Sequence, residues 1–130
     1  MKKLCIICCL IVTVLSINAQ TEWYQASQFA IKHNTLEWSD WQPSDVQICI
    51  NYKQDIITIY SPEIQKYQIV EAMPDPIDAT GQQLKYIASN LTRNKEYVYI
   101  RFRKENNGNS QIYVDFYNGS IVYNIHQINR

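Results

Sequence analysis

Apolar and polar side chains alternate along most of this chain, and turn-forming residues interrupt the alternation at short intervals. The segment 96–103 is the clearest case, because Val98, Ile100 and Phe102 alternate with tyrosine and arginine. A period of two is typical of β-strands that bury one face. The pattern predicts strands over 23–33, 46–52, 56–60, 66–70, 83–89, 96–103, 111–117 and 120–128.

The connections between these strands are short, which favours antiparallel pairing of strands that follow each other in sequence. Asn118-Gly119 is typical of a two-residue hairpin turn, and 106–109 contains only turn-forming residues. We therefore expect an all-β fold: a single antiparallel meander of about seven or eight strands, as a small barrel or a curled sheet. Short helices are the alternative for 27–33 and 82–89.

The expected hairpin of 96–103 and 111–117 determines which side chains face the core. A slip of one residue in its register would exchange the two faces, so the apolar residues fix the pairing. The expected core is Val98, Ile100, Phe102, Ile112, Val114, Phe116, Ile48, Ile50, Ile57, Ile59 and Ile69.

The N-terminus has the three parts of a secretory signal peptide: Lys2 and Lys3, an apolar run over 4–15, and the small residue Ala19 at the exit. The run is shorter than the roughly 20 apolar residues that span a bilayer. We expect residues 1–19 to be a signal peptide and 20–130 a single β domain. The domain would be exported to the periplasm, the outer surface or the medium, with no membrane span after cleavage. The alternative is an uncleaved N-terminal anchor.

Cleavage changes both charge and cysteine content. Loss of Lys2 and Lys3 lowers the Lys and Arg count from 12 to 10 against 12 Asp and Glu, which gives a net charge of −2. We expect no nucleic-acid partner, because such partners select a concentrated basic face. Cys49 is the one cysteine that remains, so no intramolecular disulfide can form, and we expect it to pack as a small apolar side chain.

No residue pattern marks a catalytic or metal centre. His33 and His126 have no second ligand at i+2 or i+4, and the three glycines stand in turns rather than in a phosphate loop. We expect no catalytic residues, no metal and no cofactor, and we do not expect an enzyme.

The tyrosines are the candidate binding residues. All ten lie beyond residue 19, and several fall on the strand face opposite the expected core. Tyrosine is enriched in recognition surfaces because it combines an apolar ring with a hydroxyl group. The alternative is that these rings only stabilise the sheet through cross-strand pairs. The candidate face consists of Tyr97, Tyr99, Arg101, Tyr113, Asp115 and Tyr117.

Trp38 and Trp41 are further candidates, in the irregular segment 37–43. One interpretation is an aromatic platform for a ligand. The other, which we favour, is that a large ring plugs one end of a small barrel.

The strand pattern of 47–51, 55–61 and 65–70, with Trp-Ser-Asp-Trp before it and Tyr-Asn-Ile near the end, resembles small exported β-rich proteins of unassigned function from gut Bacteroidales. That resemblance implies export and no particular activity. More distantly, the strand count and the early tryptophans resemble lipocalin-like barrels, which implies ligand binding. The chain lacks the Gly-x-Trp and the C-terminal helix of lipocalins.

Together these features predict an exported, non-catalytic binding module. Its partner would be a glycan, a peptide or a small amphipathic molecule, held on the tyrosine-rich sheet face. The alternative is a structural or protein-interaction component of the cell envelope without a small-molecule ligand.

Overall fold

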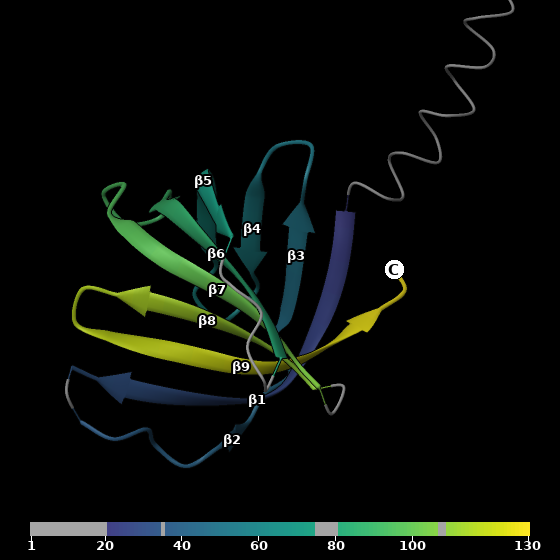
Figure 1. Cartoon of the computed structure of the whole chain (residues 1–130), viewed down its shortest axis with the longest axis vertical. Helices are drawn as coiled ribbons and strands as arrows, with labels where there is room; N and C mark the ends of the chain where they lie inside the picture. Colours follow the sequence, from purple (N-terminus) through teal and green to yellow (C-terminus); the bar gives the residue numbers. More distant parts are fainter. Residues whose placement is uncertain (1–20, 35, 75–80, 107–108) are drawn as a thin grey trace, which may run out of the picture.

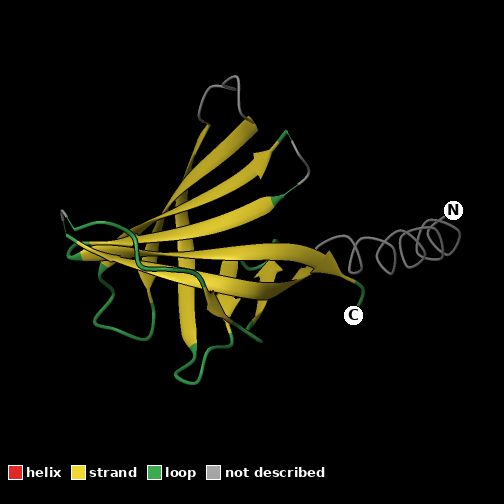
Figure 2. Cartoon of the chain, turned by 90° about the horizontal axis from the view of Figure 1, so that it is seen from below, coloured by secondary structure: helices red, strands yellow, loops and turns green. Residues whose placement is uncertain are grey.

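The computed structural model describes residues 21–34, 36–74, 81–106 and 109–130, so the expected signal peptide lies outside the described residues. Within these ranges every regular element is a β-strand (Figure 2). No helix there has the length and apolar character of a membrane span. The strands are β1 (Thr21–His33), β2 (Gln42–Pro43), β3 (Gln47–Asn51), β4 (Ile56–Ile59), β5 (Gln65–Pro74), β6 (Gly81–Asn90), β7 (Tyr97–Glu105), β8 (Ser110–Phe116) and β9 (Gly119–Ile128).

Eight of these strands form a closed antiparallel barrel. From β3 to β9 each strand pairs with the next, and β1 pairs with both β3 and β9 (Figure 1). Closure gives every barrel strand two hydrogen-bonded neighbours, each over part of the strand's length, and leaves no strand at a fully open sheet edge. The predicted all-β meander is confirmed, in its barrel form. The alternative of helices over 27–33 and 82–89 is wrong, because both segments are strands.

The short strand β2 is an addition to the barrel, and it follows from a bulge in β1. The register of β1 against β9 shifts at Ser27, and beyond that point β1 no longer pairs with β3. The chain that follows β1 turns back along it instead. The amide of Ser44 donates to the carbonyl of Ser27 at 2.9 Å, and the amide of Ser39 donates to that of Ile31 at 2.8 Å. This segment covers the part of β1 that would otherwise be an open edge.

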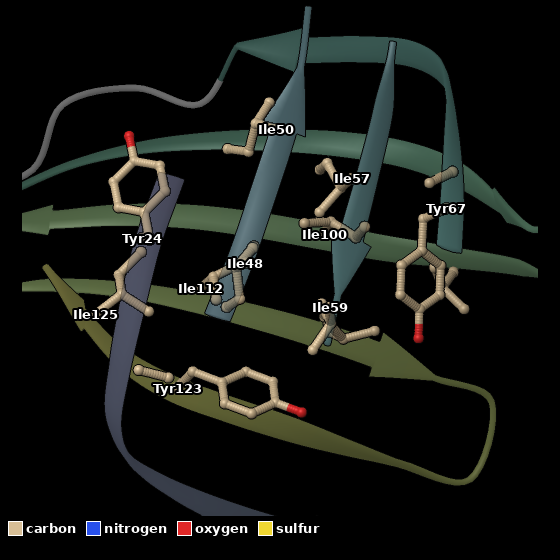
Figure 3. Packing of buried hydrophobic residues seen from close by; sticks show 14 residues of the cluster. Tyr24, Ile48, Ile50, Ile57, Ile59, Tyr67, Ile100, Ile112, Tyr123 and Ile125 are labelled. Atoms are coloured by element: carbon tan, nitrogen blue, oxygen red, sulfur yellow. The ribbon is translucent and has the colours of Figure 1, made fainter. Parts of the chain in front are cut away.

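Inward-facing side chains fill the barrel (Figure 3). An eight-stranded barrel has an interior just wide enough for its own side chains. Every residue expected in the core belongs to the central cluster or packs against it. Three tyrosines that the alternation did not mark are also part of it: Tyr24, Tyr67 and Tyr123.

The last hairpin differs from the expected one. Phe116 pairs with Gly119, so the two turn residues are Tyr117 and Asn118, one position earlier than predicted. Gly119 is the first residue of β9 and lies opposite His33 of β1. A Cβ atom at Gly119 would collide with the carbonyl oxygen of Lys32, at a separation that no real side chain tolerates. The glycine is therefore required by the close approach of β1.

Gly119→Ala is expected to lower the free energy of unfolding by about 1–3 kcal/mol, because the backbone of β1 or β9 must shift to admit the methyl group. Urea denaturation measures this change. The control is Tyr117→Ala, whose exposed side chain should contribute less than about 0.5 kcal/mol. Equal losses in the two variants would contradict the close contact with β1.

Candidate functional site

The structure brings four of the predicted binding residues onto one outer face of the barrel. Tyr99 pairs with Asp115 and Arg101 pairs with Tyr113 across β7 and β8. This is the register that the apolar face requires, with Ile100 opposite Val114 on the inner side. The outer surface of a closed barrel is convex, so this face forms a wall rather than a cleft.

Arg101, Tyr113, Asp115 and Trp38 form what we call the wall cluster. The Arg101 guanidinium donates from Nε to Asp115 Oδ2 at 2.7 Å and from Nη2 to Oδ1 at 3.0 Å. It also lies 4.1 Å from the centre of the Tyr113 ring. Ser120 donates to the same carboxylate at 2.7 Å. The charges of this cluster are therefore already paired within the protein.

Trp38 lies on the wall and does not plug the barrel. Its ring meets the Tyr113 ring edge-on, with centroids 6.0 Å apart. Trp23 stacks on Tyr60 at 5.7 Å, Trp41 is exposed, and none of the three tryptophans belongs to the core cluster. The predicted plug is wrong because isoleucines, valines and tyrosines take the inward positions. Trp38 instead fastens the segment after β1 to the outside of β8.

Tyr97 and Tyr117 lie elsewhere, at the distal end of the barrel. We use this name for the end that carries the β4–β5, β6–β7 and β8–β9 turns, opposite the proximal end where β1 begins and β9 ends. A pocket of about 840 Å³, the distal pocket, lies there. Its polar non-aromatic residues are Ser61, Glu63, Gln65, Asn90, Thr92, Arg93, Glu96 and Asn118. Its tyrosines are Tyr67, Tyr97 and Tyr117, and its apolar residues are Pro62, Ile64, Phe116 and Ile121.

The floor of the distal pocket is a hydrogen-bonded network around Gln65. Tyr67 donates its hydroxyl to Gln65 Oε1 at 2.5 Å, and Gln65 Nε2 donates to Ser61 Oγ at 3.0 Å. Tyr123 lies close enough to Gln65 for that side chain to lower the pKa of Tyr123, which partly offsets the effect of burial. Figure 3 shows the hydroxyl groups of Tyr67 and Tyr123 directed toward the same end of the barrel. Burial raises the pKa of both tyrosines, so both hydroxyls stay protonated at neutral pH.

Asn90 stabilises the side of the distal pocket that is formed by the β6–β7 turn. This side chain is buried, and its Oδ1 accepts hydrogen bonds from the Thr92 amide at 3.1 Å and the Thr92 hydroxyl at 2.7 Å. Such a local side-chain bond stabilises a turn. The turn then places Arg93 and Glu96 at the pocket.

The rim of the distal pocket is aromatic and charged. Tyr97 is 70% exposed and Tyr117 is fully exposed. Arg93 makes no ion pair with any residue that the structure describes. The rim therefore offers two aromatic rings and a cation to solvent.

The proximal end differs around Glu22, whose carboxylate already has a partner among the described residues. Glu22 accepts a hydrogen bond from the hydroxyl of Tyr24, and its carboxylate also lies near Tyr52. The Tyr24 ring packs edge-on against Phe102, with centroids 5.3 Å apart. Burial, reinforced by the Glu22 carboxylate, raises the pKa of Tyr24 well above its usual value and that of Tyr52 to about 12. A smaller pocket of about 370 Å³ lies beside Glu22 and the C-terminal residues.

The alternation of apolar and polar residues did not identify Gln65 and Tyr67, the floor of the distal pocket, as candidate site residues. Gln65 and Tyr67 are inward-facing residues of β5, where a polar or hydroxyl-bearing side chain needs a partner. Two such residues at successive inward positions are the signal that could have pointed to the pocket. No group of three or more His, Cys, Asp or Glu that could hold a metal occurs in the part of the chain that the structure describes.

Comparison of this chain with protein families, with curated proteins and with solved structures finds no match. The resemblances to exported Bacteroidales proteins and to lipocalin-like barrels therefore stay predictions, and the candidate site rests on the geometry of the distal pocket.

Proposed function

We propose that this protein is an exported, non-catalytic binding module that takes a small ligand into the distal pocket. The observation that carries the proposal is the pocket itself, a concavity of about 840 Å³ with a polar floor and an aromatic rim. Pockets for small molecules have roughly 300–1,000 Å³, and the mouths of β-barrels are among their usual places.

The distal pocket suits a ligand better than the wall does. On the wall, Arg101 and Asp115 form a two-point ion pair, and the Tyr113 ring is covered by Arg101 and Trp38. A ligand there would have to break these contacts. At the distal pocket, the rings of Tyr97 and Tyr117 are exposed to solvent. Two of the predicted binding residues are thus available in a concave setting.

The chemistry of the lining residues supports binding rather than catalysis. The fifteen described residues that line the pocket include no histidine, cysteine or lysine. These are the side chains that most often act as nucleophile or general base near neutral pH. Glu63 and Glu96 are exposed, without the burial that tunes a catalytic carboxyl group.

A protein-observed NMR screen of a small-molecule fragment library, followed through the backbone amide signals, tests the proposal. Bound fragments are expected to shift the backbone amides of 61–65, 90–97 and 116–121. Tyr97→Ala is expected to weaken these fragments about tenfold, as truncation of an aromatic anchor does. The matched control is Tyr99→Ala, two residues along the same strand, which lines the wall and should leave affinity unchanged.

The opposite pattern would contradict the distal pocket. Fragments that lose affinity with Tyr99→Ala and shift amides around Tyr113 would place the site on the wall. A screen without any binder would favour the alternative of a structural or protein-interaction component. The internal pairing of the wall cluster fits that alternative, since those residues already stabilise the barrel.

A further inference from the structure

We infer, building on the proposed function, that the ligand of the distal pocket is a short neutral oligosaccharide. Eight of the fifteen lining residues are polar and non-aromatic, and only four are apolar. A hydrocarbon chain in this pocket would remove the polar groups from water without offering them partners, which is unfavourable for each group left unpaired. A ligand that carries hydroxyl groups along its whole length satisfies them instead.

The charges in the pocket favour a neutral ligand. Arg93 supplies one cation, and Glu63 and Glu96 supply two anions. The two carboxylates oppose a phosphate or a polyanionic sugar, and Arg93 opposes an amine. A sugar hydroxyl both donates and accepts hydrogen bonds, so it can donate to a carboxylate and accept from a guanidinium. The arginine and the two glutamates of the pocket can then all form hydrogen bonds with the same ligand.

The rim supplies the apolar contacts that a sugar ring needs. The C–H face of a pyranose ring is flat and weakly apolar, and an exposed aromatic ring offers a matching surface. Tyr97 at the start of β7 and Tyr117 in the β8–β9 turn present two such rings on different elements. Neither ring packs against another aromatic ring within the described residues.

The floor is ordered in advance for a polar ligand. Both polar ends of the Gln65 amide are held, one by Tyr67 and the other by Ser61. Side chains that are already oriented lose little freedom when a ligand arrives. The Ser61 hydroxyl in turn donates to the Glu63 carbonyl at 2.6 Å, which extends this ordered network to the β4–β5 turn.

The barrel favours a sugar over a peptide. Extended peptides are commonly bound by strand addition, which needs an open sheet edge. The part of β5 beyond Gln68 that pairs with β6 alone runs toward the proximal end, and the residues around the distal pocket come largely from turns. No backbone ladder is therefore offered to a peptide at this site.

The test uses the purified protein on an array of neutral glycans, followed by NMR titration with the saccharides that bind. Maltose, cellobiose, lactose and diacetylchitobiose are titrated in every case, with dodecanoate and a glucuronate-containing disaccharide as the competing classes. We expect at least one neutral saccharide to give saturable shifts at 61–65, 90–97 and 116–121. Tyr97→Ala and Tyr117→Ala should each weaken it about tenfold, and the wall control Tyr99→Ala should not.

Salt dependence separates a neutral ligand from an anionic one. The affinity for the neutral saccharide should change less than about twofold between roughly 50 mM and 500 mM salt, because no net charge is neutralised on binding. A drop of about tenfold or more would contradict neutrality and point to an anionic ligand paired with Arg93.

The two proposals fail in different ways. If dodecanoate or the charged disaccharide binds in the distal pocket and no neutral saccharide does, the carbohydrate class is wrong and the binding function stands. If neither these probes nor the fragment library binds there, both proposals are overturned. A saccharide that binds equally to the Tyr97→Ala and Tyr117→Ala variants but is lost with Tyr99→Ala would overturn the distal pocket as its site.

Discussion

Ile100→Ala is expected to lower the free energy of unfolding by about 2–5 kcal/mol, more than any other single substitution proposed for this barrel. Ile100 lies in the middle of β7, is fully buried, and is paired with Tyr86 on one side and Val114 on the other. Truncation removes apolar area and leaves a cavity that a closed barrel cannot easily collapse, since both neighbouring strands are held by hydrogen bonds. Urea denaturation monitored by circular dichroism measures the change.

Leu36→Ala is the control, because this leucine is 64% exposed and lies outside the barrel strands. It should cost less than about 0.5 kcal/mol. If Ile100→Ala cost as little as Leu36→Ala, Ile100 would have to lie on the outer face of β7.

Alkaline unfolding is the second large effect, and it is expected as the pH rises from about 10 toward 12. Burial raises the pKa of Tyr52 to about 12 and also raises that of five other tyrosines: Tyr24, Tyr67, Tyr86, Tyr113 and Tyr123. In the unfolded chain a tyrosine titrates near 10, so above that pH the unfolded state loses protons that the folded state keeps. Their contribution to stability is fully present below about pH 10 and declines as the pH rises further.

Phenolate absorbance and far-ultraviolet circular dichroism, recorded together, check this expectation. The absorbance of the buried tyrosines should rise only as the β-sheet signal is lost, above the pH at which a free tyrosine ionises. Tyr97→Phe changes an exposed residue and should leave the unfolding pH where it is. If all tyrosines titrated together near pH 10 while the sheet signal persisted, the buried hydroxyls would have to be accessible to water.

The sequence carried enough information for the strands and for much of the core. In β7 and β8 every second residue is apolar, so one register alone buries Val98, Ile100, Ile112 and Val114 together, and the structure has that register. The strand predicted over 66–70 is too short, because β5 continues to Pro74. A proline is tolerated at such a strand end, where it need not donate to the ladder.

The distal pocket could not be predicted from the alternation of apolar and polar residues. Its residues come from three turns and the strands beside them, far apart in sequence, and only closure of the barrel brings them to one end. Tyr67 illustrates the difficulty: alternation alone does not say whether a tyrosine faces water or the core, and only its bond to Gln65 makes burial acceptable. The wall cluster was easier to foresee, because a single hairpin assembles most of it.

The pairing of β1 with β9 joins the two ends of the domain through ten residue pairs, from Trp23 with Ile128 to His33 with Gly119. Among the nine described strands β1 is synthesised first, and its partner β9 is synthesised last. Contacts of such long sequence separation form slowly, because the loop between them must be ordered first. Until then β1 and the growing meander expose unpaired strand edges, which can recruit other chains. This small barrel therefore depends on its final ten-residue strand for closure, and a chain shortened before Gly119 would remain an open, association-prone sheet.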